Sequence, residues 1–207
     1  MKAVLMSIQP KWCELIASGK KTVEVRKTKP KLETPFKVYI YCTNTKPYLV
    51  WGDVFRGNWE TEFTHLSGYN RADAEKIWDV FNGKVIGEFV CDKVDEYRYG
   101  VYDGEFCYHI PTAEGEKTFM EYNEAEEYGN GKPLYFWHIT DLVIYDNPRE
   151  LGEFATFCDG LTPSKCDKCE YSYKENTESG SYEECMCNGL KPITRPPQSW
   201  CYVEVEG

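Results

Sequence analysis

The sequence lacks the features of an exported or membrane-bound protein. No apolar run in its 207 residues approaches the roughly 18 residues needed to cross a bilayer. The opening segment, residues 1–8, is too short and too weakly flanked by charge to be a signal peptide. We therefore expect a cytoplasmic protein that makes no contact with a membrane.

Several common catalytic and binding patterns are also missing. No glycine-rich phosphate loop follows a predicted strand, and the serine and cysteine residues have no assignable base for a hydrolase triad. The sequence contains no internal repeat and no low-complexity tract. Its composition, 42% hydrophobic, 28% charged and 15% aromatic, is typical of a folded globular chain rather than a disordered one.

Positive charge is scarce overall but concentrated near the N-terminus. The formal net charge is -10, yet residues 1–40 contain nine Lys or Arg against three Glu, a balance of +6 that leaves -16 for the remainder. An acidic body repels nucleic acid, so a polyanion would have to approach the basic N-terminal face. The alternative is an ordinary solvated surface rich in lysine.

Ten cysteines would suggest disulfides in a secreted protein, but without an export signal thiols and metal thiolates are the better expectation. Two close pairs, separated by fifteen residues, can supply a tetrahedral thiolate site for structural zinc: Cys166, Cys169, Cys185 and Cys187. Cys158 and Cys201 are candidate substitutes for one ligand. The binding of zinc would fold a segment that has little apolar material of its own. The alternative is a set of unligated loop thiols.

The order of apolar and turn-forming residues predicts a mixed fold of strands and helices. A strand at 3–8 is followed by a helix that begins at Pro10 and ends at Gly19, and by strands at 18–27 and 36–42. Further along, the pattern predicts a helix at 70–81, a strand at 84–92, a hairpin or loop at 94–117, a helix at 118–128, a strand at 134–145, a helix from Asn147 and a last strand at 200–205.

The basic stretch SGKKTVEVRK, residues 18–27, raises the question of function. In a regular strand Thr22, Glu24 and Arg26 share one face, while Lys21 lies on the other. These three polar residues either form the wall of a site or have a structural role, in which an ion pair between Glu24 and Arg26 stiffens the fold. A pocket that includes Lys21 would need a bulge or the end of the strand.

The residues Gly19, Lys21, Glu24 and Arg26 match the GxKxxExR signature of the ASCH domain, a member of the PUA-like superfamily. The chain resembles ASCH proteins of bacterial and prophage origin. The resemblance implies an α+β fold, a PUA-like β-barrel flanked by helices, here with a small zinc-stapled C-terminal insert. We expect residues 1–158 to form this domain with aromatic insertions, 159–195 the cysteine-rich insert, and 196–207 a final strand that returns to the barrel.

The family implies work on RNA or nucleotides. Its amidohydrolase branch removes the acetyl group from acetylcytidine with a Lys, a Thr and a Glu. Lys21 matches the lysine, but Glu24 stands at the position of the nucleophilic threonine, so that triad is broken here. Glu88 is only a guess for the third residue. Some ASCH proteins are linked to RNA cleavage, which does not depend on the threonine.

We interpret the chain as a module that binds RNA or a modified nucleoside, with Zn as a structural cofactor. The predicted ligand contacts are Lys20, Lys21, Thr22, Glu24, Arg26 and Trp12, and Trp137, Tyr41 or Trp200 could also stack on a base. Two alternatives stay open. One is an amidohydrolase or ribonuclease with Lys21 as acid or base and Glu24 polarising water or the substrate. The other is a factor of a mobile element whose aromatic insertions bind a protein. His138, with no assignable carboxylate partner, is interpreted as a packing residue.

Overall fold

The computed structural model describes residues 2–44, 82–157 and 190–204. The predicted helix at 70–81 and the cysteines Cys166, Cys169, Cys185 and Cys187 lie outside the described residues, as does Cys158. The zinc site therefore stays a prediction.

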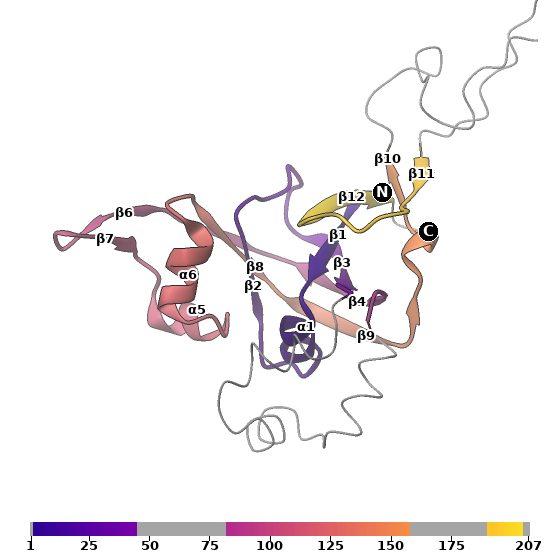
Figure 1. Ribbon diagram of the computed structural model, residues 1–207, viewed down its shortest axis with the longest axis horizontal. Coiled ribbons are helices and arrows are strands. Elements are labelled where there is room, and N and C mark those ends of the chain that lie inside the picture. The colour runs from indigo at the N-terminus through magenta and orange to yellow at the C-terminus, as the bar shows by residue number, and fades with distance from the viewer. Residues whose placement is uncertain (1, 45–81, 158–189, 205–207) are drawn as a thin grey trace, which may run out of the picture.

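Strands dominate the described part of the chain (Figure 1). They are β1 Lys2–Ile8, β2 Val23–Arg26, β3 Phe36–Cys42, β4 Val85–Cys91, β5 Val94–Tyr97, β6 Tyr99–Tyr102, β7 Glu105–Tyr108, β8 Leu134–His138, β9 Thr140–Arg149, β10 Ala155–Phe157, β11 Leu190–Pro192 and β12 Trp200–Glu204. The helices are α1 Pro10–Ala17, α5 Thr112–Glu116, α6 Tyr122–Gly129 and a 3-10 helix Leu151–Glu153. None of these helices has the length and apolar character needed to span a bilayer.

Two sheets form the body of the molecule. The larger has five strands in the order β12-β1-β3-β4-β9, in which β1 and β3 run parallel and the other neighbours are antiparallel. The smaller has the order β2-β8-β5 and is antiparallel throughout. Two further pairs, β6-β7 and β10-β11, extend from this body (Figure 1).

Alternation along the strands explains how the sheets pack. Phe36, Val38 and Ile40 on one face of β3 join a core that also contains Ile16 of α1 and Trp137 of β8. The opposite face of β3 presents Tyr39 and Tyr41 to a second core. Helix α1 and the three-stranded sheet therefore cover one face of the larger sheet.

The closed barrel that the resemblance implies is not found among the described strands. No ladder of hydrogen bonds joins the two sheets in this part of the chain, so each keeps its own edges. The run 134–145, predicted as one strand, passes from one sheet to the other. It divides between His138 and Thr140, and β8 joins the smaller sheet while β9 joins the larger. Asp141, with φ of 47°, lies where an extra residue of β9 bulges opposite β4.

Other local predictions fared differently. The strand at 84–92 and a hairpin within 94–117 are confirmed by β4 and by β6-β7. The helix expected from Asn147 is wrong, because β9 continues to Arg149, and a 3-10 turn at Leu151–Glu153 leads into β10, which pairs with β11. The helix expected at 118–128 begins later, at Tyr122, where Glu121 and Glu124 form a capping box.

Gly87 of β4 is a position where the close approach of two strands excludes a side chain. A Cβ added there would lie 2.3 Å from the carbonyl oxygen of Val143 on β9. We expect Gly87→Ala to lower the free energy of unfolding by about 1–3 kcal/mol, because backbone must move to relieve the overlap. The measurement is urea denaturation. Gly152→Ala, where a Cβ meets nothing within 4 Å, is the control, and equal stability of the two variants would contradict this account.

Candidate functional site

The end of α1 places Lys21 at the entrance to β2. Gly19 has φ of 72°, a left-handed conformation that favours glycine, and the amides of Lys20 and Lys21 both donate to the carbonyl of Leu15. The helix ends at Gly19 as predicted, and the chain turns into β2 two residues after Lys21. Lys21 therefore lies outside the regular strand and is free of its alternation.

Glu24 and Arg26 point between the two sheets. In the antiparallel pairing of β2 with β8, Glu24 is opposite Trp137 and Arg26 is opposite Tyr135, and opposite residues share a face. Trp137 belongs to the core between the sheets. The charged face of β2 is therefore buried, as is the opposite face, where Val23 and Val25 join a third core.

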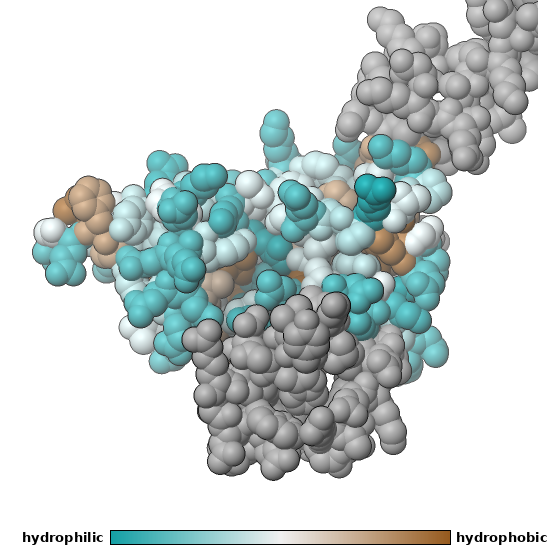
Figure 2. Space-filling model, in the orientation of Figure 1, coloured by the Kyte–Doolittle hydropathy of each residue, from teal (hydrophilic) through white to brown (hydrophobic). Residues whose placement is uncertain are grey.

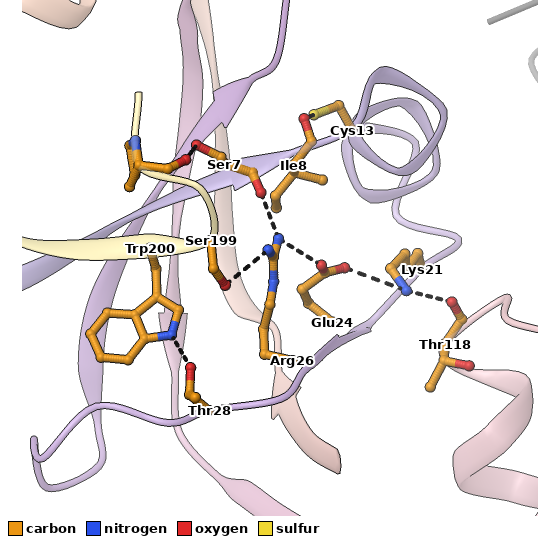
Figure 3. Close-up of polar contacts among 11 residues, drawn as sticks. Ser7, Ile8, Cys13, Lys21, Glu24, Arg26, Thr28, Thr118, Ser199 and Trp200 are labelled. Carbon is orange, nitrogen blue, oxygen red and sulfur yellow. Dashed lines mark hydrogen bonds and ion pairs between the residues drawn. The ribbon is translucent and has the colours of Figure 1, made fainter. Parts of the chain in front are cut away.

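Lys21, Glu24 and Arg26 converge into one buried ion-pair network (Figure 3). Glu24 Oε1 lies 2.9 Å from Arg26 Nη2, and Glu24 Oε2 lies 3.5 Å from Lys21 Nζ. The three residues are only 1%, 5% and 7% exposed in chain order. One carboxylate thus bridges two cations almost entirely out of contact with water.

Both cations also bond to atoms of other elements. Arg26 Nη2 donates to the carbonyl of Ser7 on β1 at 2.8 Å, and Nη1 lies 3.4 Å from Ser199 Oγ. Lys21 Nζ donates to the carbonyl of Thr118, which follows α5 (Figure 3). The network therefore ties β2 to the larger sheet on one side and to the α5 region on the other.

Burial changes the acidity of the lysine. Loss of solvation lowers the pKa of Lys21 below its ordinary 10.5, and the Glu24 carboxylate opposes that shift without cancelling it. A lysine with a lowered pKa beside a carboxylate can exchange a proton more readily than a surface lysine. The group has the electrostatic character of a functional residue.

Trp12 lies next to this network, at the surface. Its half-buried ring is 4.8 Å from Lys21 Nζ and 4.3 Å from Lys11 Nζ. Lys20 and Thr22, which flank Lys21 in the chain, are exposed. The structure thus brings Trp12, Lys21, Glu24 and Arg26 together, with Trp12 as the member that solvent reaches.

Two buried donors near the network have no hydrogen-bond partner within the described residues, Arg26 Nε and Trp137 Nε1. A buried donor without an acceptor costs free energy. These positions would attract the oxygen of a water molecule or a ligand.

The other aromatic candidates differ in accessibility. Trp137 and Tyr41 are buried in the two cores. Trp200 is partly exposed, and its Nε1 donates to Thr28 Oγ1 at 3.0 Å. Trp12 and Trp200 are therefore the two that could meet a ligand without rearrangement of a core.

The described cysteines lie mainly in packed surroundings. Cys13, Cys42 and Cys91 are buried, as expected for packing residues. Burial raises the pKa of the half-buried Cys201 to about 11. Its thiol is accordingly protonated at neutral pH.

The sequence interpretation missed the surroundings of His138. His138 Nε2 lies 2.8 Å from Asp95 Oδ2 and 3.8 Å from Glu114 Oε2. His138 therefore has carboxylate partners, which the interpretation could not assign. No spacing in the sequence signals this group, because pairing of β5 with β8 and the position of α5 bring it together.

Comparison with known protein families identifies the part of the chain that contains the network. The family model of the ASCH domain matches residues 6–128, which contain the whole ion-pair network. The chain belongs to the ASCH domain family. Members of this family are generally associated with RNA.

Solved structures show the same fold as this ASCH chain. The crystal structure of ASCH from Zymomonas mobilis is 16% identical, with a TM-score of 0.50, and the match covers 98% of this chain and 87% of that one. A point variant of the same Zymomonas mobilis protein also gives a TM-score of 0.50 at 16% identity, over 98% of this chain and 88% of that one. No curated protein sequence matches the chain.

Glu24 is the group on which the two buried cations depend. We expect Glu24→Gln to lower the free energy of unfolding by about 3–5 kcal/mol, because it leaves Lys21 and Arg26 buried without a counter-charge. Denaturation with urea measures the change. Glu96→Gln, which disturbs ion pairs with the more exposed Lys29 and Arg98, should cost less than about 1 kcal/mol. Similar losses in the two variants would show that the network is not effectively buried.

The lowered pKa of Lys21 makes its contribution depend on pH. Between the pKa in the folded state and the ordinary 10.5, the unfolded chain binds more protons at Lys21 than the folded chain, so its contribution to stability rises with pH. We expect the stability of the wild type minus that of Lys21→Met to increase from neutral pH towards 10.5, by at most about 1.4 kcal/mol per pH unit. Denaturation across this range measures it. The exposed Lys20→Met should show no such trend, and a flat difference for Lys21→Met would refute the lowered pKa.

Proposed function

We propose that this ASCH domain binds RNA or a modified nucleoside at the surface around Trp12. The observation that carries the proposal is the position of Trp12, a half-buried ring that lies directly over a buried lysine and beside a surface lysine. A ring in that setting can stack on a base while the cations meet its phosphate or polar edge.

The distribution of charge along the sequence supports an approach of RNA to the N-terminal part of the domain. Lys20, Lys27, Lys29 and Lys31 are exposed, and all belong to the basic N-terminal part of a chain that is otherwise acidic. Because the rest of the chain is acidic, only this basic part would attract a polyanion. The proposal is therefore a short contact with one or a few nucleotides rather than a long track along the phosphates.

In this proposal the ion-pair network has two roles. Glu24 and Arg26 fix β2 between the sheets, and Lys21 forms the floor beneath Trp12. Movement of the Trp12 ring would open Lys21, and behind it Glu24, to a ligand. Lys20 and Thr22, both exposed, would contact the ligand at the edge of the same surface.

Catalysis is a second candidate function, favoured by the lowered pKa of Lys21. Lys21 would act as acid or base, and Glu24 would polarise water or the substrate. Because Glu24 occupies the place of the family's threonine, hydrolysis of an acetylated cytidine would use water directly. Cleavage of RNA is the other reaction open to the same pair.

Protein interaction is a third candidate, favoured by the hairpin β6-β7. Its side chains Val101 and Phe106 are 58% and 67% exposed, and the hairpin forms an apolar patch at the far left of the molecule (Figure 2). An exposed apolar patch of this kind suits contact with another protein, such as a component of a mobile element.

Binding of labelled single-stranded RNA, followed by fluorescence anisotropy at several salt concentrations, tests the first proposal. We expect Trp12→Ala to weaken binding by about tenfold or more, because one stacked base contributes on the order of 1–3 kcal/mol. Lys20→Ala should lower the slope of log affinity against log salt by about one. The controls are Phe106→Ala on the hairpin and Lys191→Ala on β11, which should bind as the wild type does.

The outcomes separate the three candidates. Affinity that is unchanged in Trp12→Ala would overturn the proposed surface, and affinity lost only in Phe106→Ala would transfer it to the hairpin. Release of acetate from acetylcytidine, or cut RNA, that disappears in Lys21→Met would establish catalysis.

A further inference from the structure

A second polar cluster lies on the other face of the smaller sheet from Glu24 and Arg26, the face that carries Val23. It consists of Asp95 on β5, Glu114 on α5 and His138 at the end of β8. One ligand atom from each residue lies within 4.8 Å of the other two. Three elements that are distant in the sequence therefore direct one donor atom each to a common point.

The dimensions suit a divalent metal ion. Bonds of about 2.1 Å to nitrogen and oxygen place neighbouring donor atoms roughly 3–3.5 Å apart. The separations from His138 Nε2, 2.8 Å to Asp95 and 3.8 Å to Glu114, bracket that spacing. Small movements of side chains that are only 15–24% exposed would complete the geometry.

The hydrogen bonding of the three residues is incomplete without a metal ion. His138 Nε2 lies 2.8 Å from Asp95 Oδ2, and a ring nitrogen carries one hydrogen, so a hydrogen bond to Asp95 leaves none for Glu114. Glu114 Oε2 is left buried and without a hydrogen-bond partner among the described residues. A buried carboxylate oxygen that lacks a donor is costly, and a metal ion would satisfy all three donor atoms at once.

Two lysines partly neutralise the carboxylates at present. Lys93 Nζ lies 2.8 Å from Asp95 Oδ2, and Lys117 Nζ lies 2.7 Å from Glu114 Oε1. Their side chains are 59% and 43% exposed, so both can turn into solvent without disturbing a core. They would compete with a metal ion for the carboxylates but would not block its position.

We propose that Asp95, Glu114 and His138 form a binding site for a divalent transition-metal ion such as Mn²⁺ or Zn²⁺. Two carboxylates and an imidazole form a hard to borderline ligand set, which suits these ions better than soft ones. Three protein ligands leave coordination positions open to water or to the oxygen of a ligand, unlike a closed structural site. The site is separate from the predicted thiolate zinc site, and it does not depend on the binding of RNA.

The site is connected to β2 through backbone. The carbonyl of Lys117, three residues after Glu114, accepts hydrogen bonds from the amides of Thr22 and Val23. The next carbonyl, that of Thr118, accepts from Lys21 Nζ. An ion that fixes Glu114 would thereby also fix the segment that holds Lys21.

Titration of the metal-free full chain with Mn²⁺, followed by calorimetry and by the loss of the free Mn²⁺ EPR signal, tests the proposal. Manganese is the probe because it binds thiolates poorly, which separates this site from the cysteines. We expect one Mn²⁺ site per chain and a rise in Tm on binding. Glu114→Gln and His138→Ala should each weaken binding by about tenfold or more.

Matched variants distinguish ligands from bystanders. Glu116→Gln on the same helix and His109→Ala, at the residue that follows β7 and stacks on Tyr102, should bind Mn²⁺ as the wild type does. Lys117→Ala should bind Mn²⁺ more tightly, because the variant lacks a cation that competes for Glu114. If the three residues formed only a structural cluster of ion pairs, Lys117→Ala would not change Mn²⁺ binding. Absence of Mn²⁺ binding, or binding that is equally strong in Glu114→Gln, would overturn the proposal, and neither result would bear on RNA binding at Trp12.

Discussion

The structure depends on a single carboxylate, that of Glu24, between two buried cations. In the interior the attraction between these charges is strong, but so is the cost of leaving any one of them without a partner. Glu24 satisfies Lys21 and Arg26 together, and each cation reaches on to a carbonyl of a different element. The short strand β2 is therefore held at both ends by charge as well as by its pairing with β8, and the two sheets and α5 are fixed relative to it.

Because of this arrangement, the charged residues of the family signature are buried beneath the molecular surface. Glu24 and Arg26 are engaged inside the fold, so in the proposed function recognition would begin with Trp12 and the exposed lysines. Lys21 belongs to both layers, since it bonds inward to Glu24 and lies under the Trp12 ring. A buried polar network whose groups are paired restricts the side chains that it contains, and Lys21 is held in this way beneath Trp12.

Much of the fold could be predicted from local pattern, whereas the site could not. The alternation of β3, the Gly19 stop of α1 and the identity of β4 follow from periodicity and turn chemistry, which act over a few residues. The division of 134–145 into β8 and β9 could not be predicted, because both halves have the same apolar alternation and only tertiary pairing assigns them to different sheets. Regular alternation places Lys21 and Glu24 apart, and the sequence allowed their convergence only at a bulge or at the end of the strand. The late start of β2, at Val23, supplies that strand end, which the local pattern could not fix.

The same long-range pairing explains why the two polar clusters lie next to one another. Val23 of β2 is paired with His138 of β8, so the first residue of the motif strand and the histidine of the second cluster are neighbours across a ladder. The carbonyls of Lys117 and Thr118 then accept hydrogen bonds from this end of β2, from the amides of Thr22 and Val23 and from the amine of Lys21. A change in charge at Glu114 would therefore act on the residues that follow it, and one of these, Thr118, accepts the hydrogen bond of Lys21 Nζ. Because a buried lysine responds to small changes in its hydrogen bonding, a metal ion bound at the proposed site would act on Lys21 through this segment.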